Sequence, residues 1–187
     1  MISSIFLPVS TRIYVPSHHG DLSGPLEDFM KRLLFISGCI VLLVVSAHAG
    51  QTKDFPDNLT FTTVDGKTLD SAALKGAPLV LVIGTCWCPE CRQEALEVQK
   101  AYLEYKDKGV AFLFVLAASK DEEIRDFVKT HKITYPVAKD NGLVDALGVR
   151  TIPQTFFYSE GGKFSKRIFG CATHRELTSN IEKIMAK

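Results

Sequence analysis

Three cysteines stand close together near the middle of the chain, in the sequence Thr85-Cys86-Trp87-Cys88-Pro89-Glu90-Cys91. Two residues separate Cys88 from Cys91, a spacing that lets two thiols close a small disulfide ring and open it again by thiol–disulfide exchange. The same spacing can supply half of a zinc site, and Cys86 extends it to C-x-C-x-x-C. A purely structural disulfide is the third alternative.

The residues on either side predict a strand followed by a helix. Leu79-Val80-Leu81-Val82-Ile83 is a short apolar run rich in β-branched side chains, which is typical of a buried strand. Pro89 suits the first turn of a helix, where no amide donor is needed. The strand therefore delivers Cys88 to a helix N-terminus, where free N–H groups and the helix dipole stabilise a thiolate. Because Trp87 directly precedes Cys88 in this setting, we favour the redox pair. Apolar residues continue at helical spacing after the cysteines: Ala95, Leu96, Val98, Ala101, Tyr102 and Tyr105.

The composition limits the classes of function. The chain has 187 residues, a formal net charge of +1 and a hydrophobic fraction of 46%. Nucleic-acid-binding domains usually carry a strong excess of basic residues. We therefore expect no nucleic-acid partner.

Residues 30–49 have the pattern of a secretory signal peptide. Met30 is followed by a basic pair and an apolar run, and Ala47-His48-Ala49 is an A-x-A cleavage signal. The apolar run is short for a transmembrane span. We therefore expect cleavage before Gly50 and a periplasmic or otherwise extracytoplasmic protein. An uncleaved membrane anchor is one alternative, and lipidation at Cys39 is another.

Residues 1–29 precede this pattern and contain Pro, Ser and Gly without a sustained period. Since a signal peptide begins at the N-terminus, we interpret this stretch as a start assigned too early, with a disordered extension as the alternative. Residues 50–187 then form the mature chain. That length predicts one domain with its own hydrophobic core.

The mature chain alternates predicted strands and helices. Asp65-Gly66 is a hairpin turn signal after a Thr-rich run. Residues 110–117 form a second apolar strand, and Ser119-Lys120-Asp121-Glu122 is a capping box that opens a helix. The order strand, helix, strand, helix implies parallel pairing with a right-handed crossover. Residues 164–169 alternate as the return arm of a second hairpin, and Thr173-His174-Arg175-Glu176 opens a last amphipathic helix.

Together these motifs resemble the thioredoxin superfamily, and within it the TlpA/ResA-like branch of exported thiol–disulfide oxidoreductases. The motif Trp87-Cys88-Pro89-Glu90-Cys91 is followed by Val149-Arg150-Thr151-Ile152-Pro153 and a hairpin, as in that family. The resemblance covers residues 57–186. It implies an α/β, thioredoxin-like fold: a central mixed β-sheet flanked by helices, with an N-terminal β-hairpin extension and an inserted helix.

The resemblance also implies the roles of individual residues. Cys88, the exposed and helix-capping sulfur, is expected to be the attacking thiolate, and Cys91 is expected to resolve the mixed disulfide. The Ile152–Pro153 peptide bond should be cis and pack beside the cysteine pair. The Ile152 backbone, Pro153 and Trp87 would then contact a bound peptide. No cofactor and no metal are required.

Glu94 matches an acidic residue that ResA-like proteins carry three positions after the second cysteine, where it adjusts cysteine acidity and helps proton transfer. A solvated acid on a helix surface is the alternative. Thioredoxins place a buried aspartate in the strand before the pair, whereas this chain has Val82, which makes Glu94 more important. Cys86 and Cys171 could form an accessory disulfide, or they could be two separate buried thiols.

The function predicted on this basis is an exported thiol–disulfide oxidoreductase that reduces protein disulfides through Cys88 and Cys91. Apocytochrome c is a candidate client, and a membrane thiol reductase is the expected electron donor. Two other functions stay open. Thr85-x-x-Cys88 mimics the end of a peroxiredoxin signature, although Leu81 stands where that signature has proline. A copper or zinc carrier built on the same cysteines is the other.

Overall fold

The computed structural model describes residues 54–186. The predictions for residues 1–29 and for the signal peptide, residues 30–49, lie outside the described residues. Among the helices of residues 54–186, none is long and apolar enough to cross a membrane.

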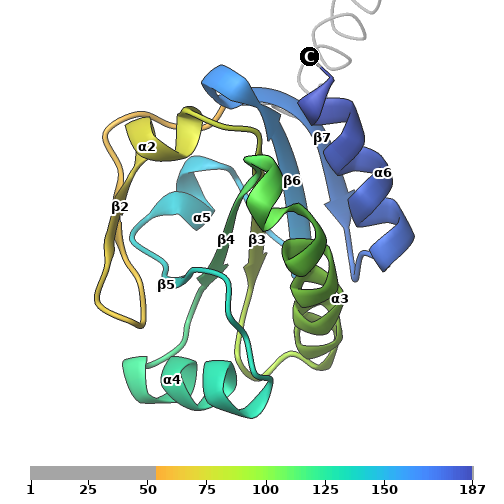
Figure 1. Ribbon diagram of the computed structural model, residues 1–187. Helices are drawn as coiled ribbons and strands as arrows, with labels where there is room; N and C mark the ends of the chain where they lie inside the picture. Colours follow the sequence, from red (N-terminus) through yellow and green to blue (C-terminus); the bar gives the residue numbers. More distant parts are fainter. Residues whose placement is uncertain (1–53, 187) are drawn as a thin grey trace, which may run out of the picture. The chain divides into compact units, whose positions relative to one another are not determined.

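A five-stranded mixed β-sheet forms the centre of the domain, with the strand order β5-β4-β3-β6-β7 (Figure 1). Central strand β3 pairs in parallel with β4 and antiparallel with β6. β4 pairs in parallel with β5, and β6 pairs antiparallel with β7. The predicted central mixed sheet is therefore confirmed. The strands are β3 (Leu79–Gly84), β4 (Ala111–Leu116), β5 (Val137–Lys139), β6 (Gln154–Ser159) and β7 (Lys163–Phe169).

Helices pack on both faces of this sheet. Val80 and Val82 of β3 belong to the core on one face, together with side chains of α3, α4 and α6, whereas Leu81 faces the opposite core, with α2 and α5. Successive side chains of a strand point to opposite faces, so a strand buried on both faces must be apolar throughout. The helices are α2 (Ser71–Lys75), α3 (Pro89–Tyr105), α4 (Asp121–Thr130), α5 (Leu143–Ala146) and α6 (His174–Met185), with the 3₁₀ turns η1 (Lys106–Lys108) and η2 (Glu160–Gly162).

A β-hairpin precedes the central sheet, as predicted. Strands β1 (Thr60–Thr62) and β2 (Thr68–Asp70) pair antiparallel. Gly66 supplies the positive φ of 82° that the turn requires. The N–H of Val64 donates to the carbonyl of Val137 at 2.9 Å, which fastens the hairpin to β5.

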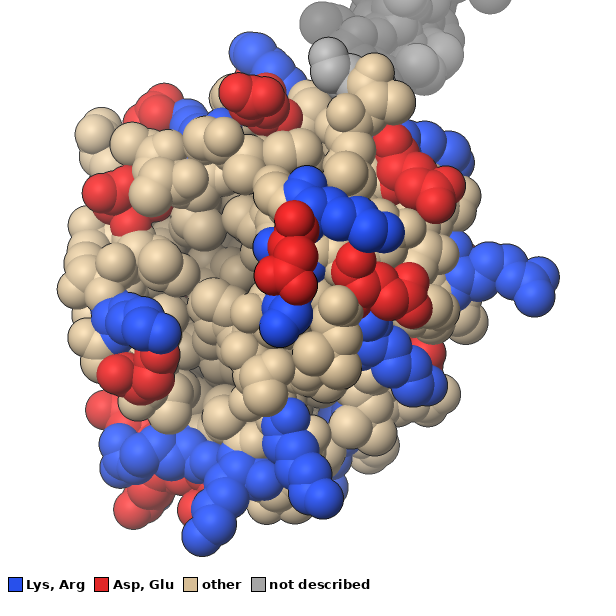
Figure 2. Space-filling model, in the orientation of Figure 1, with Lys and Arg blue, Asp and Glu red and all other residues tan. Residues whose placement is uncertain are grey.

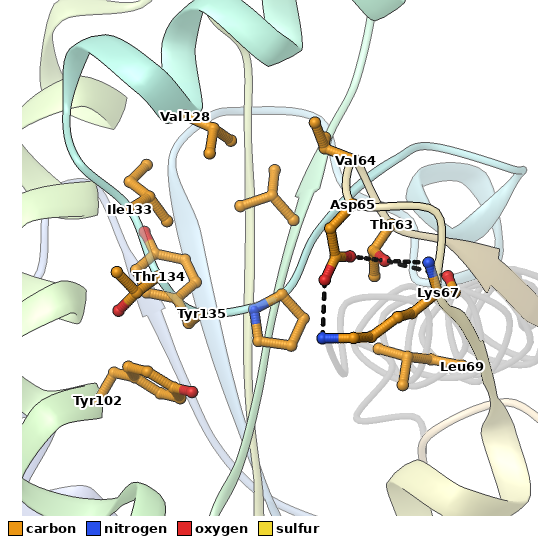
Figure 3. A pocket seen from close by; sticks show the side chains of 12 residues that line it. Thr63, Val64, Asp65, Lys67, Leu69, Tyr102, Val128, Ile133, Thr134 and Tyr135 are labelled. Carbon is orange, nitrogen blue, oxygen red and sulfur yellow. Dashed lines mark hydrogen bonds and ion pairs between the residues drawn. The ribbon is translucent and has the colours of Figure 1, made fainter.

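A cavity of about 410 Å³ opens beside this hairpin (Figure 3). Asp65 and Lys67 form an ion pair of 2.8 Å on one side of it. Tyr102 of α3 and Tyr135, which precedes β5, line the other side. Since no cysteine lines this cavity, it is separate from the redox pair.

Helix α4 begins later than predicted. Its N-cap is Lys120 rather than Ser119, and the Lys120 N–H donates to the Glu123 carboxylate at 2.7 Å. Only the Glu123 half of a capping box is therefore formed, one residue later than predicted, because a lysine side chain cannot accept a hydrogen bond. The Ser119 hydroxyl instead donates to the Ala117 carbonyl at 2.8 Å and accepts the N–H of Cys86 at 3.3 Å. It therefore supports the loop that carries the cysteines.

Charged side chains of both signs are interspersed on the face that Figure 2 shows. Basic side chains gather at the lower edge of this view, where Figure 1 places α4. This mixture agrees with a sequence that has 22 basic and 21 acidic residues.

Candidate active site

Cys88 caps the N-terminus of α3 directly after the loop that follows β3. Its Sγ accepts the N–H of Cys91 at 3.2 Å, and Pro89 occupies the first helical position. A sulfur at this position receives a backbone donor and lies at the positive end of the helix dipole, which favours a thiolate. The predicted delivery of a cysteine to a helix N-terminus is confirmed.

The two sulfurs differ in accessibility. Cys88 is 4% exposed and Cys91 is fully buried. The expectation of an exposed Cys88 is wrong, because Cys88 belongs to the same buried core cluster as Cys91. Cys88 is nevertheless the more accessible of the two. Its thiol donates to the Glu90 carboxylate at 3.5 Å, so the acid between the cysteines lies beside the outer sulfur.

Cys91 fits against the end of β3 because position 84 has no side chain. A Cβ at Gly84 would lie 2.9 Å from Cys91 Sγ and 3.0 Å from the ring of Phe114. Burial raises the pKa of Cys91, and the hydrogen bond to Cys88 raises it further. Cys91 therefore keeps its proton at neutral pH.

The segment before β6 lies next to the cysteines. The Ile152–Pro153 peptide bond is cis, as predicted. Ile152 packs against the core that contains Cys88 and Cys91. The carbonyl of Pro153 accepts the N–H of Gly170 at 2.9 Å, so the loop after β7 meets this segment beside the cysteine pair.

Glu94 is the buried acid of the site. It is fully buried, and its Oε1 accepts the Thr155 hydroxyl at 2.6 Å and the N–H of Ala172 at 3.2 Å. Its Oε2 has no hydrogen-bond partner. Burial raises the pKa of Glu94 to about 7, although the bonds from Thr155 and Ala172 act to lower it. The alternative of a solvated helix acid is therefore wrong.

Thr155 and Ala172 are site residues that the sequence interpretation missed. Thr155 lies in β6, two residues after Pro153, and Ala172 lies in the loop before α6. Thr155 is a polar residue directly before the apolar run Phe156-Phe157-Tyr158, and this position is the signal that could have identified its role.

All four cysteines of residues 54–186, the pair Cys88 and Cys91 included, are free thiols in this structure, so the accessory disulfide stays a prediction. Cys86 and Cys171 have different neighbours. The N–H of Cys86 donates to Ser119 before α4, whereas Cys171 directly precedes Ala172, which is bonded to Glu94. Within residues 54–186, no group of three or more His, Cys, Asp or Glu side chains is placed to hold a metal ion.

A groove of about 490 Å³ begins at the cysteine loop. Trp87 forms part of its wall and is 62% exposed, one of the few large apolar side chains on the surface. Trp87 is therefore an exposed apolar side chain directly beside Cys88 in the sequence. The groove is lined by Cys86, Trp87, Arg92, Glu123, Asp126, Phe127, Thr130 and His131.

Comparisons with known proteins identify the family and the relatives of this chain. The Redoxin family matches residues 49–183. The thiol-disulfide oxidoreductase ResA of Bacillus thuringiensis is 28% identical over 172 residues, which cover 83% of this chain and 99% of the relative. The ResA of Halalkalibacterium halodurans is 29% identical over 170 residues, which cover 82% of this chain and 97% of the relative.

Solved structures share the fold. StoA from Bacillus subtilis has a TM-score of 0.59 and 28% identity, over 65% of this chain and 93% of StoA. A thiol:disulfide interchange protein of the thioredoxin family from Chlorobium tepidum has a TM-score of 0.64 and 23% identity, over 71% of this chain and 97% of its own. The predicted thioredoxin-like fold is confirmed.

Proposed function

The chain belongs to the Redoxin family, and we propose that it is an exported thiol–disulfide oxidoreductase that reduces disulfide bonds in protein clients. One observation carries the proposal: Cys88 Sγ caps α3 and accepts the N–H of Cys91 at 3.2 Å. This contact places a stabilised attacking sulfur next to a buried second thiol. The names of the ResA relatives and of the interchange protein support the same chemistry.

The proposed reaction has two steps. The Cys88 thiolate attacks one sulfur of a client disulfide, forms a mixed disulfide and releases the other client sulfur as a thiolate. Cys91 then attacks Cys88 Sγ, which closes the Cys88–Cys91 disulfide and frees the second client thiolate. Two electrons pass from the cysteine pair to the client.

Glu94 is proposed to take the proton of Cys91 in the second step. Its carboxylate affects the titration of Cys91, and its unpartnered Oε2 is free to accept a hydrogen bond. A general base works best when its pKa lies near the working pH. With a pKa of about 7, Glu94 can accept this proton and return it.

Client binding is proposed at the surface around the cysteine loop. Exposed Trp87 offers an apolar contact, and the Ile152 backbone before Pro153 offers hydrogen-bonding groups beside the pair. We propose that clients such as apocytochrome c meet the protein in the periplasm or in another extracytoplasmic space. A membrane thiol reductase would then restore the Cys88–Cys91 dithiol, and no bound cofactor is needed.

The test is reduction of insulin disulfides by the purified protein with dithiothreitol as the electron source. The unaltered protein and Cys86→Ala should be active, whereas Cys88→Ser should be inactive. Client trapping in cells with Cys91→Ala would then identify the substrates. If the protein consumed hydrogen peroxide rapidly and left insulin intact, the peroxiredoxin-like alternative would replace this proposal.

A further inference from the structure

A third thiol is fastened beside the redox pair. Cys171 follows Gly170, whose N–H donates to the carbonyl of Pro153 at 2.9 Å. It precedes Ala172, whose N–H donates to Glu94 Oε1 at 3.2 Å. Pro153 and Glu94 belong to segments that pack with the cysteine pair. The two hydrogen bonds therefore hold the Cys171 backbone at the active site from both sides.

The surroundings of Cys171 are those of the redox pair. Its titration is affected by Cys88 and by three glutamates of α3, and burial raises its pKa to about 11. The pKa of Cys91 is raised further still. Cys171 is also half-buried rather than fully buried, so its thiol is the more accessible of the two. Cys171 can therefore compete with Cys91 for the sulfur of Cys88.

Cys86 differs from Cys171 in these respects. It lines the groove on the α4 side, where Ser119, Glu123 and Arg92 act on its titration. The backbone N–H of Cys86 donates to Ser119 rather than to Glu94. Cys86 therefore provides the matched control, because it is another half-buried thiol close to Cys88 in the sequence.

We propose that Cys171 is a second resolving thiol of this site. The inference rests on the proposed function, because it begins from a mixed disulfide on Cys88. The Cys171 thiolate attacks Cys88 Sγ, the Cys88–Cys171 bond forms, and the bond between Cys88 and the client breaks. The client leaves as a thiolate and takes up the proton that Cys171 gave up. The unpartnered Oε2 of buried Glu94 provides a group that can carry this proton.

The Cys88–Cys171 disulfide is an additional intermediate of the same reaction cycle. Cys91 attacks Cys88 Sγ in the Cys88–Cys171 disulfide, closes the Cys88–Cys91 disulfide and returns Cys171 to a thiol. No electrons are gained or lost in this exchange. Client release can therefore proceed without Cys91. The mixed disulfide on Cys88 should accordingly be short-lived in a Cys91→Ala variant.

The test follows a glutathione adduct on Cys88. Cys91→Ala, Cys91→Ala/Cys171→Ala and Cys91→Ala/Cys86→Ala are treated with oxidised glutathione without oxygen, and their disulfides are mapped by mass spectrometry. We expect Cys91→Ala and the Cys86 double variant to lose glutathione and to contain a Cys88–Cys171 disulfide. The Cys171 double variant should keep its adduct at least about tenfold longer, because intramolecular attack by a held thiol is strongly favoured.

Other outcomes separate the two proposals. An adduct equally long-lived in Cys91→Ala and in Cys91→Ala/Cys171→Ala, or a disulfide from Cys88 to Cys86, would overturn the role of Cys171. Failure of Cys88 to form an adduct in any folded variant would overturn the proposed function itself. Cys171→Ser in the same background keeps the size of the side chain and must also preserve the adduct. Cys91→Ser replaces Cys91→Ala if the latter does not fold, as judged by circular dichroism.

Discussion

Glu94 Oε1 accepts a hydrogen bond from the Thr155 hydroxyl at 2.6 Å, which joins α3 to β6 two residues after Pro153. The same oxygen accepts the N–H of Ala172. One buried carboxyl group thus connects three chain segments that meet at the cysteine pair. Because desolvation opposes its ionisation, Glu94 gives the site a group that titrates near neutral pH.

The first prediction concerns Glu94 and the pH dependence of stability. The pKa of Glu94 is about 7 in the folded protein and 4.5 as the ordinary value. Between these values the folded state binds more protons than the unfolded state, so the free energy of unfolding must fall as pH rises. The contribution of protonated Glu94 to the free energy of unfolding is fully present below about pH 4.5. It is lost progressively as the pH rises to about 7. The loss should be on the order of 3 kcal/mol.

Urea unfolding of the reduced protein between pH 4.5 and 8 measures this loss. Glu94→Gln should remove most of it, because an amide does not titrate. Glu122→Gln, at an exposed position on α4, should retain it. Parallel pH profiles for the unaltered protein and Glu94→Gln would show that Glu94 ionises normally.

The second prediction concerns Thr155 as a positioning residue. Its hydrogen bond lowers the pKa of Glu94, so Thr155→Val should raise that pKa further. The midpoint of the pH dependence of insulin reduction should move upward, while Thr155→Ser should restore it. A lower rate with an unchanged midpoint would mean that Thr155 contributes packing alone.

The sequence predicted the local parts of this site because short-range chemistry determines them. Cys88 and Pro89 begin α3 as expected from the preference of proline for the first helical position. The capping box of Thr173 and Glu176 likewise begins α6. Each of these features depends on residues within one helical turn of each other.

The contacts of Glu94 could not be predicted in the same way. Its partners Thr155 and Ala172 are 61 and 78 residues away in the sequence, and only the packing of β6 and the following loop against α3 brings them together. The burial of Cys88 also results from tertiary packing. A helix N-terminus suggests an open sulfur, but the tertiary packing that includes Cys88 in the core with Cys91 decides its exposure.

The third prediction concerns the space for Cys91. In Gly84→Ala the new Cβ would lie 2.9 Å from Cys91 Sγ and 3.0 Å from the Phe114 ring. Because both neighbours are buried, we expect a loss of about 1–3 kcal/mol in the free energy of unfolding and slower closure of the disulfide.

Urea unfolding and a single-turnover exchange assay check this loss. Gly76→Ala is the control, because its new Cβ would lie 3.3 Å from its nearest neighbour, the carbonyl oxygen of Ala73. It should cost less stability and leave disulfide closure unchanged. Equal effects of the two substitutions would contradict a specific conflict with Cys91.

The fourth prediction distinguishes the two sulfurs by alkylation. Cys88 is the more accessible sulfur and receives a backbone donor, whereas burial raises the pKa of Cys91. Iodoacetamide at neutral pH should therefore modify Cys88 first, as read by peptide mapping. Cys91→Ser should preserve this reaction, and Cys91→Ser/Cys171→Ala should in addition accumulate mixed disulfides. Faster modification of Cys91 than of Cys88 would reverse the two roles.

The last prediction concerns the reduction potential, for which the surroundings of Cys88 are decisive. Strong oxidants among dithiol proteins stabilise the reduced form, and they do so through a stabilised thiolate. Here the Glu90 carboxylate lies 3.5 Å from Cys88 Sγ, and a like charge disfavours the thiolate. The Nε of Arg92 donates to the Cys86 carbonyl at 3.0 Å. The N–H of Cys91 is the donor that remains.

We therefore expect a reductant, with a potential nearer the roughly −270 mV of thioredoxin than the roughly −120 mV of DsbA. Equilibration against dithiothreitol or glutathione, read by the fluorescence of Trp87, measures the midpoint, since Trp87 is the single tryptophan of the chain. Glu90→Gln should raise the potential by on the order of 10 mV, because it removes the opposing charge, whereas Glu122→Gln should not change it. A midpoint above about −180 mV, the value of protein disulfide isomerase, would mean that the protein oxidises its clients instead.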